Sequence, residues 1–85
     1  AGLLPSMYYV YVLRSKADDN LYIGITNDIN RRLNDHNYGK NISTKYRRPF
    51  ELIYHEMVYS RYESRLREKY LKSGVGREWI RKNFV

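Results

Sequence analysis

Two short apolar stretches, at residues 8–13 and 21–26, dominate the first third of the chain. Both are rich in aromatic and β-branched residues, a composition that is typical of strands. Polar turn-forming residues occupy positions 16–20, and so short a connection predicts an antiparallel hairpin. Gly24 lies inside the second stretch and has no side chain to pack, so it predicts a bulge or a close approach of another group to the backbone.

The spacing of apolar positions then changes from a strand period to a helix period. Asp28 is a good helix N-cap, and Ile29, Leu33 and His36 follow it at helical spacing. These positions predict a helix over residues 28–38.

The second half of the chain repeats this change of pattern. Residues 40–49 are polar and basic and predict a loop, whereas residues 50–59 are apolar and predict a third strand. Ser60 and Glu63 match a capping box, which predicts a helix that runs to about residue 72.

The last predicted helices carry most of the remaining apolar side chains. Three of these share one face of the capped helix, at positions Tyr62, Leu66 and Tyr70. After Gly74 and Gly76 interrupt this helix, a final helix is expected over 77–84. It would bring three apolar residues to the core: Trp79, Ile80 and Phe84.

The order of predicted elements is ββα–β–αα, which indicates an α+β fold in which helices pack on a small antiparallel sheet. A chain of 85 residues has room for one domain, and we expect it over residues 7–85. Residues 1–6 lack the basic and apolar segments of a signal peptide. We expect them to be an expression-vector remnant that precedes a native start at Met7.

Composition narrows the class of partner. Sixteen Lys and Arg residues against nine Asp and Glu give a net charge of +7, which favours a polyanionic partner such as nucleic acid. A merely soluble basic surface is the alternative. No apolar run approaches the roughly 20 residues of a spanning helix, so no membrane partner is expected. Cysteine is absent, which excludes disulfides and thiolate metal sites and favours a reducing compartment, with the cytoplasm as the expected location.

Four residues in the first half of the chain suit phosphate chemistry. Arg32 and His36 are four apart on one helix face, where Arg offers a planar fork of donors and His can shuttle a proton. Tyr11 and Tyr22 lie on the two strands of the hairpin. Because the ordinary pKa of tyrosine is about 10, either would need a nearby positive charge or metal to act as a base. The alternative for each is ordinary packing or solvation.

Two acidic residues on the capped helix are candidates for a metal ligand. Glu63 already has a role in the capping box, whereas Glu68 has none. A single carboxylate can hold Mg²⁺ together with water and phosphate oxygens. The alternative for Glu68 is an i,i+4 pair with Lys72. Asn83, near the C-terminus, is a further polar candidate, and its alternative is an ordinary residue at the end of a helix.

The order and spacing of these residues resemble those of the GIY-YIG nuclease family. Residues 9–11 (YVY) are similar to its first half-motif and residues 22–24 (YIG) to its second. The resemblance extends from Met7 to the C-terminus and is strongest to small stand-alone bacterial members. The family order Tyr, Tyr, Arg, His, Glu, Asn also occurs in phage homing endonucleases and, with variations, in the nuclease subunit of bacterial excision repair. It is matched in turn by Tyr11, Tyr22, Arg32, His36, Glu68 and Asn83.

The resemblance implies a three-stranded antiparallel sheet flanked by helices. It also implies a single Mg²⁺ or Mn²⁺ ion held by Glu68 and in-line attack of water on phosphorus. Such an ion would supply Lewis-acid help and stabilise the leaving group.

The resemblance further assigns roles to the other residues of the series. Tyr11 would be the general base or would position the water, and Arg32 would hold the phosphate and stabilise its developing charge. Tyr22 and His36 would orient phosphate or water. Asn83 would steady the site.

Three positions depart from the family pattern. Tyr9 replaces the first glycine of the motif. Ile25 stands where the excision-repair type carries a lysine, and Lys45 stands where the homing type carries a second histidine. The auxiliary basic groups therefore differ, and no single family mechanism transfers whole.

Three functions remain open: a metal-dependent endonuclease, a binding module of the same fold with little activity, and an interaction domain in which the tyrosines only pack. The last does not explain the spacing of the series. DNA as substrate, and a role in repair or recombination, are favoured by the resemblance, and a protein partner could supply specificity. Non-specific phosphate contacts, which weaken steeply with salt, are expected from seven basic residues: Arg31, Lys40, Lys45, Arg47, Arg48, Arg65 and Lys69.

Overall fold

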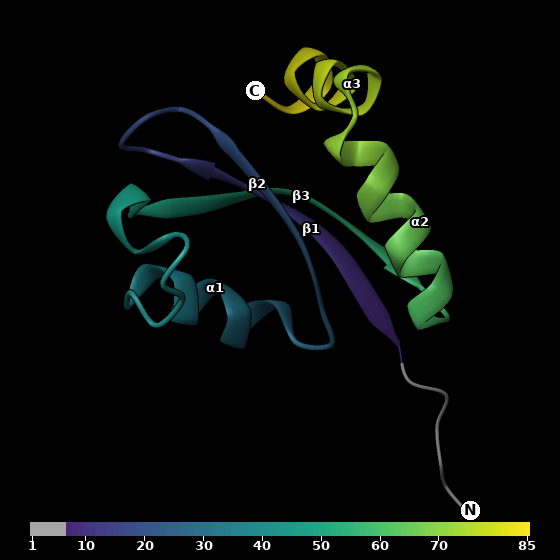
Figure 1. The fold of residues 1–85 in the computed structure, drawn as a ribbon, viewed down its shortest axis with the longest axis horizontal. Coiled ribbons are helices and arrows are strands. Elements are labelled where there is room, and N and C mark those ends of the chain that lie inside the picture. Colours follow the sequence, from purple (N-terminus) through teal and green to yellow (C-terminus); the bar gives the residue numbers. More distant parts are fainter. Residues whose placement is uncertain (1–6) are drawn as a thin grey trace, which may run out of the picture.

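The computed structural model describes residues 7–85, and the predicted vector remnant at 1–6 lies outside these described residues. Among residues 7–85, no helix is long and apolar enough to cross a membrane. The elements follow the predicted order (Figure 1): β1 (Tyr8–Ser15), β2 (Leu21–Thr26), α1 (Ile29–Asn37), the 3₁₀ helix η1 (Lys45–Arg47), β3 (Phe50–Val58), α2 (Arg61–Lys72) and α3 (Gly74–Phe84).

The three strands form one antiparallel sheet in the order β2-β1-β3. The predicted α+β class, with a small three-stranded antiparallel sheet flanked by helices, is therefore confirmed. The hairpin between β1 and β2 also forms as predicted, and β2 is an edge strand of the sheet. In Figure 1 this edge strand separates α1 from α2.

Side-chain hydrogen bonds determine where α1 begins and attach its last turn to the sheet. The Asp28 carboxylate accepts a hydrogen bond from the backbone N–H of Arg31 at 3.1 Å, which is the expected N-cap. At the other end, the Asn37 amide exchanges two hydrogen bonds with the backbone of Phe50, at 2.7 and 3.2 Å. This side chain fixes the last turn of α1 against the first residue of β3.

Each face of the sheet buries its own apolar cluster. Side chains on the face covered by α1 pack around Tyr11, Leu13 and Phe50. The opposite face packs against α2 and α3, and its buried residues are Val10, Val12, Leu21, Ile23, Leu71 and Ile80. The result is a three-layer arrangement with the sheet in the middle.

The apolar face of α2 does not pack against the sheet, although its amphipathic pattern would place it there. Tyr62 and Leu66 are 72% and 52% exposed, and Tyr70 is exposed as well. The residues that α2 buries are Ser64 and Leu71. The small side chain of Ser64 is buried at the contact between α2 and the sheet, so it allows the helix to approach the sheet closely.

The final helix is longer than predicted, and the glycines do not delay its start. The Ser73 hydroxyl accepts a hydrogen bond from the backbone N–H of Gly76 and caps α3 at Gly74. A Cβ on Gly76 would collide with the backbone of α2, so this glycine allows the two helices to approach closely. Ile80 is fully buried as predicted, whereas Trp79 and Phe84 remain more than one third exposed.

Candidate active site

Tyr11 is positioned by the register of the hairpin. It lies directly opposite Gly24 in the β1–β2 pair, and its side chain is buried. A Cβ placed on Gly24 would lie only 2.5 Å from the Tyr11 hydroxyl oxygen. The predicted close approach at Gly24 is thus made by this phenol, which needs the space that a side chain would fill.

His36 reaches the same hydroxyl from α1. Its Nε2 lies 3.1 Å from Tyr11 Oη, and its Nδ1 lies 2.8 Å from Thr44 Oγ1. The Thr44 hydroxyl donates to the carbonyl of Asn41, so it accepts from His36 Nδ1–H. This arrangement leaves Nε2 as the acceptor for the Tyr11 hydroxyl proton. Tyr11, His36 and Thr44 therefore form one buried hydrogen-bonded chain.

Aromatic contacts fix the imidazole in place. The rings of Tyr22 and His36 meet edge to face with centroids 4.7 Å apart, and Phe50 approaches His36 at 5.7 Å. Such geometry is favourable beyond the burial of area alone. The rings of Tyr11 and Tyr22 lie 6.2 Å apart, so the two tyrosines and His36 occupy one cluster.

Arg32 supplies the charge of this cluster. Burial raises the pKa of the Tyr11 hydroxyl to about 12, although the neighbouring Arg32 guanidinium acts in the opposite direction. Burial also lowers the pKa of His36, and the charge of Arg32 lowers it further. At neutral pH, Tyr11 is therefore a phenol and His36 a neutral imidazole, beside a guanidinium that stays charged.

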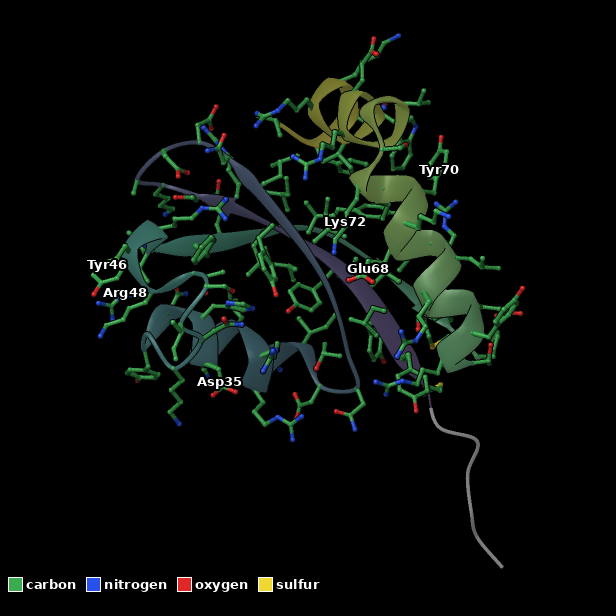
Figure 2. All side chains as sticks on the ribbon, viewed as in Figure 1. Asp35, Tyr46, Arg48, Glu68, Tyr70 and Lys72 are labelled. Atoms are coloured by element: carbon green, nitrogen blue, oxygen red, sulfur yellow. The ribbon has the colours of Figure 1, made fainter. Side chains whose placement is uncertain are left out.

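Glu68 lies on α2, across the edge strand from this cluster. Figure 2 shows the side chains of Glu68 and Lys72 on the side of α2 that faces the sheet, whereas Tyr70 points away. The Glu68 carboxylate is 3.3 Å from Lys72 Nζ, which is the i,i+4 pair considered above. Within residues 7–85, no hydrogen bond or ion pair joins Glu68 to Tyr11, Arg32 or His36.

Among residues 7–85, the side chains that could bind a metal ion suit a site with a single protein carboxylate. Residues 7–85 contain no group of three or more His, Asp or Glu side chains that could hold a metal ion. The Glu68 carboxylate is one quarter exposed and faces the sheet, so one of its oxygens could bind an ion. This fits Mg²⁺, which often takes one carboxylate with water and phosphate oxygens.

Asn83 is not brought to the cluster. It lies on α3, where it is exposed, and its amide donates to the carbonyl of Trp79 at 2.8 Å. This contact lies within its own helix and corresponds to the helix-end interpretation.

The seven basic residues predicted to contact phosphate differ in how far their side chains are already engaged in other contacts. Arg47 is the most constrained, since its Nε lies 3.4 Å from an Asp18 carboxylate oxygen and its guanidinium donates to the carbonyl of Leu21. The guanidinium of Arg48 donates to a backbone carbonyl, and Lys40 Nζ lies 3.7 Å from the Asp35 carboxylate. The other four are exposed: Arg31, Lys45, Arg65 and Lys69.

Sequence reasoning did not identify Thr44. Its side chain is fully buried beside His36, yet it comes from the polar segment at 40–49 that predicted only a loop. Nothing distinguishes this threonine locally from its polar neighbours, because its role depends on how the loop folds back over α1.

Residues 7–82 match the family of GIY-YIG catalytic domains. A UPF0213 protein of Bacillus pumilus is 43% identical over 76 residues, which cover 88% of this chain and 71% of the relative. A UPF0213 protein of Staphylococcus haemolyticus is 42% identical over 67 residues, which cover 78% of this chain and 80% of the relative.

A solved structure agrees with the fold. The solution NMR structure of a UPF0213 protein from Bacillus halodurans aligns with a TM-score of 0.55 at 33% sequence identity, covering 89% of this chain and 83% of that one. The names of these relatives state no reaction.

Proposed function

Because this chain belongs to the GIY-YIG catalytic domain family, we propose that it is an endonuclease that hydrolyses phosphodiester bonds of DNA with one divalent metal ion. The observation that supports this proposal most is the buried chain from Tyr11 through His36 to Thr44 beside the guanidinium of Arg32. A merely structural cluster does not need a charged group next to a buried phenol and imidazole.

Arg32 is the phosphate-binding residue of this mechanism. Its planar fork can donate to two phosphate oxygens. As water attacks phosphorus, negative charge grows on those oxygens, and a positioned cation stabilises that charge more than it stabilises the bound substrate.

Tyr11 and His36 handle the proton of the attacking water. With a pKa of about 12, Tyr11 is a poor base alone. Its hydroxyl can instead take a proton from water while its own proton passes to His36 Nε2, which accepts its hydrogen bond. The lowered pKa of His36 keeps the imidazole neutral before the reaction. The Thr44 hydroxyl accepts from Nδ1–H throughout and holds the tautomer that this transfer needs.

Glu68 is the residue that would hold Mg²⁺ or Mn²⁺, an ion that supplies Lewis-acid polarisation of the phosphate and charge stabilisation at the leaving oxygen. Lys72 Nζ, 3.3 Å from one oxygen of this carboxylate, would compete with the ion. Tyr22 orients the imidazole through ring contact. Asn83 would act on the site only if α3 moved, so it is the weakest of the six assignments.

A second candidate is a DNA-binding module, or a nuclease that needs a protein partner. The observation in its favour is that Glu68 pairs with Lys72 and Asn83 bonds within its own helix. Binding of a partner or substrate would then be required to free these side chains. A place in DNA repair or recombination follows from the family resemblance alone.

Nicking of supercoiled plasmid and cleavage of branched DNA, each with Mg²⁺, Mn²⁺ or EDTA, test the proposed activity. We expect cutting with either metal and none with EDTA. Metal-independent cutting, or binding of DNA with no cutting of any substrate in the panel, would reject an autonomous metal-dependent nuclease and favour the second candidate.

A further inference from the structure

A polar hollow of about 320 Å³ lies where β2 ends, between the start of α1 and the start of α2. Three guanidinium groups from two helices line it: Arg31 and Arg32 from α1, and Arg61 from α2. Other polar lining comes from Tyr8, Thr26 and Asn27. Arg61 is not among the residues that the sequence pattern suggested.

Within the described residues, 7–85, no acidic side chain lines this hollow. The nearest carboxylates along α1 are engaged elsewhere, because Asp28 caps the helix and Asp35 lies within ion-pair distance of Lys40. Arg31 donates to the neutral amide oxygen of Asn27 at 3.0 Å. Among residues 7–85, none of the ion pairs includes Arg31, Arg32 or Arg61. Three cations without an ion-pair partner among residues 7–85, gathered around one polar hollow, favour an oxyanion.

The side chain of Arg61 is held at the hollow without losing its donors. Its guanidinium carbon lies 5.9 Å from the centre of the Tyr8 ring, a distance at which a cation is attracted to the ring face. No hydrogen bond within the described chain uses its N–H groups. They are therefore free to donate to a ligand in the hollow.

The hollow shares one residue, Arg32, with the candidate active site. Arg32 belongs to both, since it lies beside the Tyr11 hydroxyl and also lines the hollow. On α2, Arg61 precedes Glu68 by seven residues, which is about two helical turns and about 10 Å along the same side of the helix. Since phosphates of one DNA strand rise by about 3.4 Å per nucleotide, this span corresponds to a few nucleotides.

We propose that the hollow lined by Arg31, Arg32 and Arg61 binds a backbone phosphate that flanks the scissile phosphate, with Arg61 as a strand-positioning residue. This inference rests on the proposed nuclease function, because it takes the ligand to be a nucleic-acid strand that also reaches Arg32. Arg61 would fix the register of the strand and would leave the reacting atoms to the residues around Tyr11.

Binding of a fluorescein-labelled DNA duplex in EDTA, over a series of salt concentrations, tests the proposal without any cleavage. Each phosphate contact contributes about 1 to the slope of log affinity against log salt. The Arg61→Gln variant should weaken binding and reduce that slope by about 1. The matched control is Lys16→Gln, which removes an exposed charge at the hairpin turn, at the other end of the sheet. We expect it to keep the wild-type slope.

A second series locates the contact on the DNA. Single phosphates around the cleavage position are replaced, one at a time, by neutral methylphosphonates. One flanking replacement should weaken binding of wild type but not of Arg61→Gln, because the two changes remove the same contact. Circular dichroism and thermal unfolding confirm that each variant is folded.

An Arg61→Gln protein with the affinity and slope of wild type would overturn the proposal, as would equal losses in Arg61→Gln and Lys16→Gln. The outcome is separate from the proposed activity. If wild type does not cut DNA but Arg61→Gln shows the expected weaker binding and smaller salt slope, the phosphate site stands and the nuclease function fails. If wild type cuts and Arg61→Gln binds normally, only the phosphate site fails.

Discussion

The Tyr11 hydroxyl connects the buried imidazole of His36 with the guanidinium of Arg32. Replacing Tyr11 by Phe removes this one oxygen and keeps the ring in the core. We expect the cleavage rate to fall by about 10²-fold or more, the range of proton-transfer catalysis, while DNA affinity changes little. Unfolding free energy should fall by about 1 kcal/mol for the lost hydrogen bond. Single-turnover cleavage and chemical denaturation measure the two effects.

The exposed phenol of Tyr46 provides the matched control, because Tyr46→Phe removes a hydroxyl that faces solvent. It should leave both rate and stability unchanged. Equal cleavage rates for wild type and Tyr11→Phe would mean that Tyr11 only packs.

His36 predicts a pH dependence of stability. Its pKa is lowered in the folded protein, so below the ordinary histidine pKa of about 6.5 the unfolded chain binds a proton that the folded chain does not. The free energy of unfolding should therefore decrease as pH falls from about 7 to about 5. Denaturant titrations across this range measure it.

The same titrations on His36→Gln should show a smaller decrease in that range, whereas His55→Gln, which removes an exposed imidazole, should retain the full decrease. A His36→Gln protein with the wild-type pH dependence would assign the effect to other groups.

Among single residues, the pattern predicted Tyr11 and Tyr22 on the two hairpin strands and Arg32 and His36 on one helix face, and the structure brings the four side chains into one cluster. Their roles in a reaction stay a prediction. The sequence could not show which groups meet. The Tyr11–His36 contact depends on how α1 docks against the sheet, and Thr44 enters only through the fold of the following loop.

At the scale of elements, the close approach of the Tyr11 phenol on β1 to Gly24 on β2 makes the site possible. A methyl group in Gly24→Ala would collide with the Tyr11 ring, and we expect a loss of about 1–3 kcal/mol in unfolding free energy. Cleavage should fall further than this loss explains, because the phenol is displaced from His36. Thermal unfolding and cleavage assays give both values.

Gly74 offers the matched control, because a Cβ there meets nothing within 4 Å. Gly74→Ala should keep or slightly increase stability and retain cleavage. A Gly24→Ala protein that behaves like Gly74→Ala would show that Tyr11 can move without consequence.

The ion pair on α2 provides a separate prediction. If Glu68 binds the metal, Lys72 competes with it, and Lys72→Gln should reduce the Mg²⁺ concentration for half-maximal cleavage by about two- to fivefold, as expected for a partly exposed pair. Lys82→Gln, an exposed charge on α3, should have no such effect. An unchanged Mg²⁺ requirement in Lys72→Gln would place the metal elsewhere.

Some element boundaries were predictable because they follow local rules, whereas the start of α3 at Gly74 was not. Asp28 and Ser60 cap their helices as their side chains dictate, and β2 has the predicted ends. The orientation of α2 was not predictable. Its apolar stripe at Tyr62, Leu66 and Tyr70 faces outward, since Ser64 lets the helix approach the sheet and no local rule reports that contact.

At the scale of the whole molecule, the sheet separates the two halves of the proposed site. The cluster around Tyr11 and His36 lies on the face covered by α1. Glu68 lies on α2, on the other side of edge strand β2 (Figure 2). A phosphate at the rim of β2 could meet Arg32 from one side and Glu68 from the other. The net charge of +7 would favour association with DNA.

In the proposed mechanism, Glu68 completes this site by holding the metal. The most direct test compares Mg²⁺-dependent cleavage by wild type, Glu68→Gln and the matched control Glu78→Gln, which removes an exposed carboxylate on α3. We predict that Glu68→Gln remains folded and binds DNA but loses cleavage by about 10²-fold or more, while Glu78→Gln cuts normally. Full cleavage by a folded Glu68→Gln protein would contradict the account.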